Sequence, residues 1–472
     1  MGANLLQPVA SNSALDTTAL PDSQFSVERL LNRTRRVEEE LQPVSVRNHS
    51  GQHIAQVPTN ARVRLGKYAD IDADSDSTLC QAKSTIAALN SVSTQPADSA
   101  CHRERWQYTA GVRIILSAAF NVYASVGITK YLHRLAEALH GRCELTIMTP
   151  EPKGFPDGAD IVRIPTWTAR NYGRLIWTMT SLRRLLSRQP DTVLLCPTPD
   201  TPPRPPLPTI SVVHDLIPLI LPESIRRRDR RLFQASLRTL RWADSILTDS
   251  ENTAKDLVQW SPRLKNRVSV CYPGPGIAVS ATPSDSAIGL QPYLLYVGGY
   301  SPHKNLLRLV SAFAALGGPP GLKLVLVGGE HHQSTDSLLM LASELGVAER
   351  IVLLSDLPDN AVSELYRSAE LFVFPSLYEG FGLPVLESLK HGTPVACSRT
   401  SSLPEVAGSL AVYFDPCDSS AIAQALRYAL AHKRALADRI AVAGQQLKTY
   451  SWDSAATLVL STAERLLDKT NR

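Results

Sequence analysis

Short runs of apolar, often β-branched residues alternate with longer amphipathic segments through most of this chain, and this alternation constrains the fold more than any other feature. The first unit is "VRIILSAAF" (residues 112–120), followed after a loop by "YLHRLAEALH" (residues 131–140), where apolar side chains recur at helical spacing. A strand followed by a loop and a helix is the repeating unit of a doubly wound α/β domain. The sequence therefore predicts parallel sheets covered by helices.

The alternation forms two series. The first continues through the expected strands "CELTIMTP", "DTVLLCP", "TISVVHDLIPL", "SILTDS" and "RVSVCYPG", and the second has "YLLYVGG", "KLVLVGG", "RIVLLSD", "LFVFPS", "TPVACS" and "AVYFDP". Between them, "PGPGIAVSATPSDSAIGLQP" has the composition of an interdomain linker. We predict two Rossmann-like domains facing a cleft, at residues 111–285 and 286–450, and a last helix within 451–472 that crosses back to the first domain. Ligands of such folds bind at the carboxyl ends of the strands.

Residues 1–110 differ in composition, being rich in Ser, Thr, Asn, Gln and Asp with little periodicity. We expect a largely disordered extension there, apart from a short helix around "FSVERLLNRTRRVEEELQ". The acidic tract "DIDADSDS" does not fit a calcium loop, because a loop starting at Asp72 would need Gly and Glu where Ser77 and Lys83 stand. We interpret it as a solvated acidic segment.

Composition narrows the class of protein. The chain of 472 residues has a formal net charge of only +5, which gives no indication of a nucleic-acid partner. Its seven cysteines are scattered without a C-x-x-C pair, as expected for reduced thiols. It has no apolar run long enough to span a bilayer and no apolar signal core at its start. These features predict a soluble, cytoplasmic protein.

The stretch "SLYEGFGLPVLESLKHGTPVA" (residues 376–396) indicates the chemistry. It places Glu379 and Glu387 on either side of a Gly-Phe-Gly bend, and Pro384 suits the first turn of the following helix. Gly380 and Gly382 allow a ligand to approach the backbone, and the amides of a helix start suit a diphosphate. The carboxylates would repel a diphosphate, so each is expected to hold hydroxyl groups. A nucleotide sugar presents this combination of groups.

This block, with its continuation "HGTPVACSRTSSLPEVAG", resembles the retaining nucleotide-sugar glycosyltransferases of family 4, which have the GT-B fold. The likeness covers roughly residues 111–470, and "YVGGYSPHKN" and "HDLIPL" lean toward mannosyltransferases of surface-polysaccharide assembly. The resemblance implies transfer of a hexose, with retention, to a glycan or lipid-linked oligosaccharide. The implied donor is GDP-mannose, with UDP-glucose as the alternative, and no metal or other cofactor is implied.

The resemblance also assigns residues. It implies that Glu379 and His214 hold the transferred hexose, that Lys304 contacts the diphosphate, and that Glu387 accepts the ribose hydroxyls. The other expected donor-binding positions lie in glycine-rich loops and at the helix start: Gly127, Gly298, Gly299, Phe381, Gly382 and Leu383.

The chain departs from the family at Gly299, where many members carry Arg. One expected cationic contact to the diphosphate is therefore missing, and His303 and Arg399 are the candidates to compensate for it.

Several alternatives remain open. The segment "SIRRRDRRLFQASLRTLRWADS" (residues 224–245) predicts a basic amphipathic helix, which suits either peripheral contact with the cytoplasmic membrane leaflet or a solvated arginine face. A sugar-nucleotide epimerase, a phosphorylase-type enzyme and a non-catalytic GT-B scaffold share the architecture. A dehydrogenase is disfavoured, because no G-x-G-x-x-G follows the first strand.

Overall fold

The computed structural model describes residues 45–47, 53–56, 111–119, 126–169, 171–279, 289–319, 321–328 and 332–470. The chain forms two units, Met1–Asp74 and Ser75–Arg472. In the first unit, β1 (Ser45–Arg47) and β2 (His53–Gln56) pair as an antiparallel hairpin, which the sequence did not predict. The rest of the expected disordered extension over 1–110, including the expected short helix and the acidic tract, lies outside the described residues.

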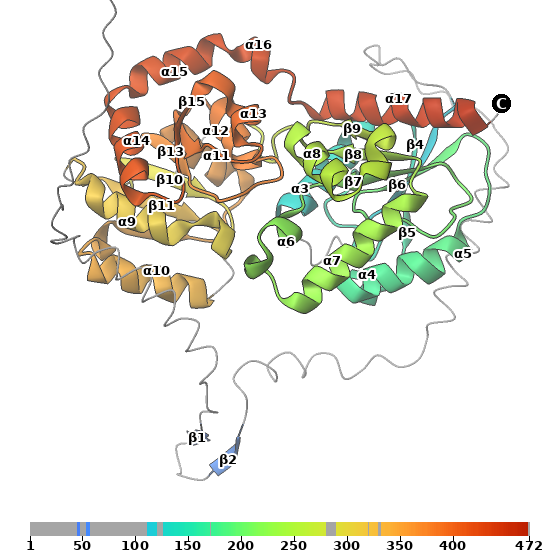
Figure 1. The fold of residues 1–472 in the computed structure, drawn as a ribbon, viewed down its shortest axis with the longest axis horizontal. Coiled ribbons are helices and arrows are strands. Elements are labelled where there is room, and N and C mark those ends of the chain that lie inside the picture. The colour runs from blue at the N-terminus through green and yellow to red at the C-terminus, as the bar shows by residue number, and fades with distance from the viewer. Residues whose placement is uncertain are drawn as a thin grey trace, which may run out of the picture. The chain divides into compact units, whose positions relative to one another are not determined.

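The second unit contains two parallel sheets, the first of seven strands in the order β5-β4-β3-β6-β7-β8-β9 (Figure 1). Its strands are β3 (Arg113–Ser117), β4 (Glu144–Thr149), β5 (Asp160–Arg163), β6 (Thr192–Cys196), β7 (Thr209–Val213), β8 (Ser245–Thr248) and β9 (Val268–Val270). Its helices are α3 (Val126–Leu139), α4 (Asn171–Trp177), α5 (Arg183–Leu185), α6 (Ile217–Ile220), α7 (Arg227–Thr239) and α8 (Glu251–Trp260). The edge strand β5 was not predicted, because it is short and its end residues are charged and exposed.

The second sheet has six parallel strands in the order β12-β11-β10-β13-β14-β15. Its strands are β10 (Tyr293–Val297), β11 (Lys323–Val327), β12 (Ile351–Leu354), β13 (Leu371–Phe374), β14 (Val395–Ser398) and β15 (Ala411–Phe414). Its helices are α9 (Leu306–Leu316), α10 (His332–Glu344), α11 (Asp359–Ser368), α12 (Leu383–Lys390), α13 (Leu403–Ala407), α14 (Ser419–Ala431), α15 (Lys433–Val442) and α16 (Gly444–Leu447). Every predicted strand of this series is present.

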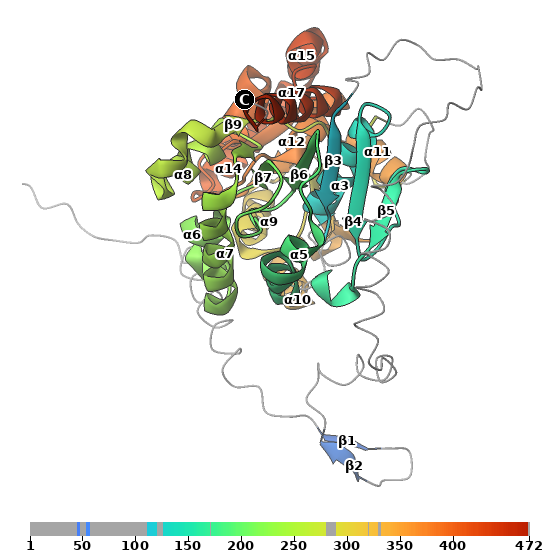
Figure 2. The ribbon, with the colours of Figure 1, turned by 90° about the vertical axis from the view of Figure 1, so that its right-hand side faces the viewer.

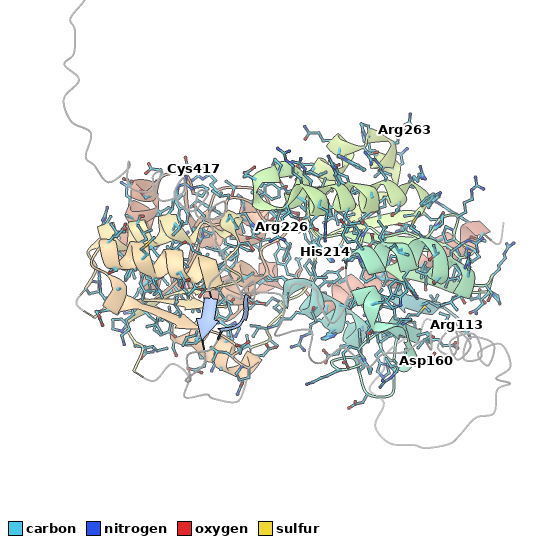
Figure 3. The ribbon with its side chains drawn as sticks, turned by 90° about the horizontal axis from the view of Figure 1, so that it is seen from below. Arg113, Asp160, His214, Arg226, Arg263 and Cys417 are labelled. Carbon is cyan, nitrogen blue, oxygen red and sulfur yellow. The ribbon has the colours of Figure 1, made fainter. Side chains whose placement is uncertain are left out.

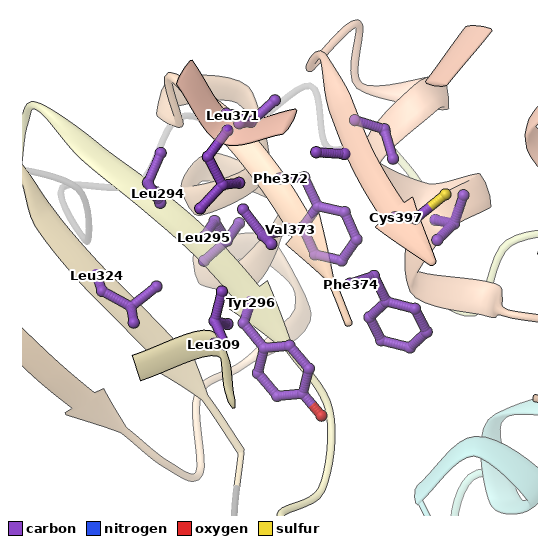
Figure 4. Close-up of a cluster of buried hydrophobic side chains, with 14 of the residues drawn as sticks. Leu294, Leu295, Tyr296, Leu309, Leu324, Leu371, Phe372, Val373, Phe374 and Cys397 are labelled. Carbon is purple, nitrogen blue, oxygen red and sulfur yellow. The ribbon is translucent and has the colours of Figure 1, made fainter. Parts of the chain in front are cut away.

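Central strands of the second sheet are apolar along their whole length because helices cover both faces. Figure 4 shows the centre of this core, where the rings of Tyr296, Phe372 and Phe374 are fully buried. The Phe374 ring stacks on both of the others at centroid distances of 5.8 Å. The core holds β10 and β13 in place, and with them the loops at their carboxyl ends.

The last helix, α17 (Trp452–Thr470), packs against the first sheet and α3 (Figures 1 and 2). Its Ala456 and Val459 are fully buried in the same core as Ile114 and Leu132. Trp452 Nε1 donates a 2.8 Å hydrogen bond to the carbonyl oxygen of Pro275. The chain therefore returns to its first Rossmann-like domain after completing the second.

The basic helix expected over residues 224–245 is shorter in the structure. Residues 222–224 form a separate 3-10 turn, α7 spans Arg227–Thr239, and a second 3-10 turn follows at Leu240–Trp242. The Thr239 hydroxyl donates to the carbonyl oxygens of Ser236 and Pro199, and β8 already begins at residue 245. The chain must leave the helix at this point to enter the sheet.

Candidate active site

The bend between β13 and α12 lies against the end of β7. A Cβ atom at Gly380 would stand 2.1 Å from the carbonyl oxygen of His214, so only glycine fits there. From the start of α8, the hydroxyls of Ser250 and Thr253 donate hydrogen bonds of 2.6 and 3.1 Å to the carbonyl oxygen of Gly380. Gly382 has φ = 101°, a left-handed conformation that favours glycine. The bend thus joins the two Rossmann-like domains.

Lys304 and Glu379, both expected to be catalytic, form an ion pair at this bend. Lys304 Nζ donates to Glu379 Oε1 at 2.7 Å, and the two side chains are only 17% and 9% exposed. The backbone N–H of Glu379 donates to Ser401 Oγ at 2.9 Å, and Ser402 Oγ donates to the Glu379 carbonyl oxygen at 3.1 Å. The pair brings together a cation suited to phosphate and a carboxylate suited to hydroxyl groups.

Glu387 lies about one turn into α12 and is 4% exposed. Its Oε1 accepts a 3.0 Å hydrogen bond from the N–H of Ile277, and its Oε2 accepts one of 2.8 Å from the hydroxyl of Tyr366. Burial raises the pKa of Glu387, and the Tyr366 hydrogen bond and the charge of Lys130 oppose that rise. A carboxylate has about four acceptor positions, and these two hydrogen bonds occupy two of them.

His214 follows β7, and its imidazole has a protein partner at each ring nitrogen (it is labelled in Figure 3). Nδ1 lies 2.7 Å from Asp249 Oδ2, and Nε2 lies 3.0 Å from the carbonyl oxygen of Pro197. Since a carbonyl only accepts, Nε2 carries a proton. Burial lowers the pKa of His214, but the charge of Asp249 and its hydrogen bond outweigh burial and raise it overall. The raised pKa favours the protonated imidazole beside Asp249.

These contacts change what His214 can do. A hydrogen bond from its ring to a hexose hydroxyl would require the loss of the Asp249 or the Pro197 contact. Its main-chain oxygen lies against Gly380, and Thr253 Oγ1 donates to that oxygen at 3.3 Å. The geometry therefore favours His214 as a positioning residue that fixes the end of β7 beside the bend.

The glycines expected to face the diphosphate have different surroundings. Gly298 has φ = 153° and is tightly enclosed, since a Cβ there would lie 2.7 Å from Tyr296 Oη, while Tyr296 donates to the carbonyl oxygen of Gly299 at 2.7 Å. Gly299 and Gly127 are exposed, and a Cβ at either would meet no atom within 4 Å. Gly127 is the second residue of α3, and residues 120–125 before it are outside the described part of the chain.

Phe381 was expected to bind donor, but its side chain belongs to the core. It is 5% exposed, and its ring contacts the rings of Tyr272 and Tyr450 at centroid distances of 6.4 and 5.7 Å. Leu383 packs against the same core. Any contact of Phe381 with a ligand must therefore come from its backbone, as the helix-start argument requires.

Neither proposed substitute for the missing arginine is well placed. Burial, with the charge of Lys304, lowers the pKa of His303 to about 4, so this imidazole is neutral near pH 7. Arg399 lies after β14, its guanidinium is 5.7 Å from the centre of the Tyr413 ring, and it lines a separate surface pocket. Of the three residues considered, Lys304 is the one whose charge the structure places beside Glu379.

Several residues of the site were missed or only partly interpreted from the sequence. Ser250 caps α8 by accepting from the N–H of Thr253, and its hydroxyl also donates to the carbonyl oxygen of Gly380. Glu405 of the second domain accepts from the backbone N–H groups of Glu251 and Asn252 at 2.7 and 3.3 Å. Asp249 was detectable in principle, because it follows β8 and the carboxyl ends of parallel strands share one edge.

Two family models match this chain. One described as "Glycosyltransferase Family 4" matches residues 126–275, and one described as "Glycosyl transferases group 1" matches residues 283–447. They cover the two Rossmann-like domains in turn. The chain belongs to the glycosyltransferases of family 4.

Among curated relatives, the chain is 36% identical over 174 residues to the O-antigen chain mannosyltransferase B of Escherichia coli, covering 36% of this chain and 45% of that protein. It is 29% identical over 275 residues to the serotype-specific mannosyltransferase WbdA of Escherichia coli, covering 55% of this chain and 34% of that protein. The chain thus spans about half, or less, of the length of these relatives. Both relatives are mannosyltransferases by name.

Solved structures confirm the GT-B-type fold. Sucrose-phosphate synthase from Thermosynechococcus elongatus superposes with a TM-score of 0.60 at 19% identity, covering 76% of this chain and 100% of that one. WaaG, a glycosyltransferase involved in lipopolysaccharide biosynthesis, gives a TM-score of 0.58 at 19% identity, covering 73% and 99%. At such identities the likeness concerns the fold alone.

Proposed function

We propose that the protein transfers a hexose from a nucleotide sugar to a glycan acceptor in surface-polysaccharide synthesis, with GDP-mannose as the first candidate donor. The observation that carries the proposal is the pair of Lys304 and Glu379 at a glycine bend, with the buried carboxylate of Glu387 in the first turns of the helix that follows the bend. Lys304 serves the diphosphate, Glu379 the hexose and Glu387 the ribose. The naming of two relatives as mannosyltransferases supports mannose as the sugar.

The proposed transfer proceeds with retention of the anomeric configuration. The acceptor hydroxyl oxygen bonds to the anomeric carbon on the face from which the phosphate departs, the bond between that carbon and the phosphate oxygen breaks, and the phosphate takes the hydroxyl proton. Lys304 and the amides at the start of α12 stabilise the negative charge that develops on the diphosphate. Binding of the diphosphate draws Lys304 toward phosphate, which frees Glu379 Oε1 for a sugar hydroxyl.

Metal independence is part of the proposal. Within the described part of the chain, no group of three or more His, Cys, Asp or Glu residues is arranged to hold a metal ion. Lys304 supplies a positive charge at the bend in the place where a metal would otherwise act. Transfer is expected to continue unchanged in excess EDTA, whereas loss of transfer that Mg²⁺ or Mn²⁺ restores would refute this part.

We further propose peripheral contact with an anionic membrane surface. None of the described helices is both long and apolar enough to cross a membrane. The first domain has exposed aromatic and aliphatic side chains near α4, with Trp167 46%, Tyr172 40% and Ile176 55% exposed. Helix α7 lies beside α4, and the Arg228 guanidinium is 4.7 Å from the centre of the Tyr172 ring. Exposed aromatic side chains beside arginines suit the membrane interface.

Vesicle co-sedimentation tests this contact. Binding to vesicles that contain anionic lipid should fall when Arg227, Arg228 and Arg231 of α7 are changed to Gln together, and also with Ile176→Ser. The matched control is Arg434→Gln on α15, an exposed arginine of the second domain. Binding that ignores anionic lipid, or that survives all these changes, would contradict the proposal.

Calorimetric titration with GDP, UDP, ADP and CMP tests the donor assignment, together with turnover of GDP-mannose and UDP-glucose. Tight binding of GDP, and turnover of GDP-mannose, are expected. Preference for UDP and UDP-glucose would support the glucosyltransferase alternative. Absence of binding and turnover would favour the non-catalytic scaffold.

A further inference from the structure

We propose that a surface pocket on the second domain binds an oligosaccharide portion of the glycan, separately from the donor site. The proposal rests on the proposed function for the kind of sugar involved. The pocket has a volume of about 660 Å³, within the range of about 300–1,000 Å³ typical of small-molecule sites. It lies at the carboxyl ends of β14 and β15, where α14 forms one wall.

The lining of the pocket has the chemistry that neutral sugars require. Tyr428, on α14, is 53% exposed. Its ring stacks on the ring of His432, with 4.2 Å between the ring centres. An exposed aromatic ring offers an apolar face for the C–H side of a pyranose while its hydroxyl stays polar. Three polar residues are exposed in the same pocket: Arg399, Asp415 and Gln424. The first supplies hydrogen-bond donors, the second supplies acceptors and the third supplies both. A purely apolar or purely charged ligand would leave half of this lining unmatched.

Two walls of the pocket are connected to residues of the candidate active site, one through the chain and one through a hydrogen bond. Thr400 lines the pocket, and the next two residues, Ser401 and Ser402, bind the backbone of Glu379. On the other wall, the carbonyl oxygen of Pro416 accepts a 2.7 Å hydrogen bond from the side chain of Asn305, the residue after Lys304. The pocket is therefore connected to both partners of the ion pair through the hydrogen bonds of Ser401, Ser402 and Asn305.

The position of the pocket suggests which part of the glycan it takes. The reacting end must reach Glu379 and the anomeric carbon of the donor, so the pocket on β14 and β15 suits sugar units further along the chain. Such a site retains a growing polymer between transfers and raises the local concentration of its end. Short acceptors cannot fill the pocket, and long acceptors gain affinity from it.

The experiment measures binding of an α-linked mannose tetrasaccharide by saturation-transfer NMR and calorimetry, with GDP binding measured in parallel. Tyr428→Ala should weaken tetrasaccharide binding about five- to tenfold through loss of the aromatic face. Tyr428→Phe is the matched control and should retain binding, because it keeps the ring. Both variants should bind GDP as the wild type does, and since Tyr428 is half exposed they should unfold at nearly the wild-type temperature.

The outcomes separate this inference from the proposed function. Absence of tetrasaccharide binding by the wild type, or equal binding by wild type and Tyr428→Ala, would overturn the pocket even if GDP-mannose is turned over. Tetrasaccharide binding that depends on Tyr428, in a protein that neither binds GDP nor turns over a nucleotide sugar, would keep the pocket and refute the transferase. If Arg399→Gln also loses tetrasaccharide binding, the sugar contacts the wall at the end of β14 as well as the wall formed by α14.

Discussion

The carboxylate of Glu379 accepts a hydrogen bond from the ammonium group of Lys304 at 2.7 Å, so the side chains expected to hold the sugar and the diphosphate are bonded to each other. The bond crosses from the turn before α9 to the bend before α12, and both side chains are nearly buried. Each charge therefore satisfies the other inside the fold. Binding of donor must exchange this contact for contacts with the ligand.

The ion pair of Lys304 and Glu379 should contribute to the free energy of unfolding. Lys304→Met leaves a buried carboxylate without its cation, and we expect the free energy of unfolding to fall by about 1–3 kcal/mol. Adding Glu379→Gln should recover part of the loss, giving a coupling energy of about 0.5–3 kcal/mol in urea unfolding. The control is the surface pair of Lys433 and Glu370, whose coupling should not exceed about 1 kcal/mol. If the effects of Lys304→Met and Glu379→Gln on the free energy of unfolding simply add, the ion pair contributes nothing to stability.

Glu387 is expected to bind the ribose as well as the protein. Glu387→Ala should weaken GDP binding by about 1.5–3 kcal/mol, the range for hydrogen bonds to a charged group. Tyr366→Phe removes only the protein donor at Glu387 Oε2 and should leave GDP affinity near the wild-type value. Unchanged GDP affinity in Glu387→Ala, measured by calorimetry on folded protein, would refute the ribose assignment.

Gly299 permits a gain-of-function test. A side chain there meets no atom within 4 Å of its Cβ, and the backbone needs no left-handed conformation. Gly299→Arg should therefore restore a second cation near the diphosphate and tighten GDP binding by about 1.5–3 kcal/mol. Gly299→Gln tests for effects of bulk without charge and should leave the affinity near wild type. Equal effects of the two substitutions would mean that position 299 does not face the diphosphate.

The pair of His214 and Asp249 predicts a dependence of stability on pH. Because the pKa of His214 in the folded protein is raised above its ordinary value of about 6.5, its stabilising effect is complete below that pH. The effect is lost as pH rises through the folded-state pKa. The difference in unfolding free energy between wild type and His214→Gln should therefore shrink above pH 6.5, by at most about 1.4 kcal/mol per pH unit. A difference that grows with pH would contradict the imidazolium.

The sequence predicted the architecture well because parallel strands between covering helices are continuous apolar runs. The buried strand of residues 371–374, for example, is Leu-Phe-Val-Phe, and it lies at the centre of the second sheet. The short edge strand β5 and the true limits of α7 were not predictable from such runs. Their limits depend on tertiary contacts, such as the hydrogen bond from Thr239 to Pro199.

The residues of the candidate site could be predicted from the sequence, but several of their contacts could not. The spacing of Glu379, Glu387 and Lys304 in recognisable blocks identified them, and the structure brings Lys304 and Glu379 together. The sequence could not show that Asp249 and Pro197 engage both nitrogens of His214, since these partners come from other strand ends. It also could not show that Phe381, inside the same motif, turns its ring into the core.

The start of α8 in the first domain is capped by a carboxylate from the second, through the bonds of Glu405 to the N–H groups of Glu251 and Asn252. A helix that loses such a cap loses about 0.5–2 kcal/mol. Any movement that separates the two domains would break this cap and the two hydroxyl bonds to Gly380. Separation of the two domains would therefore leave the first N–H groups of α8 without their carboxylate partner, and the free-energy cost of opening falls on the start of this helix.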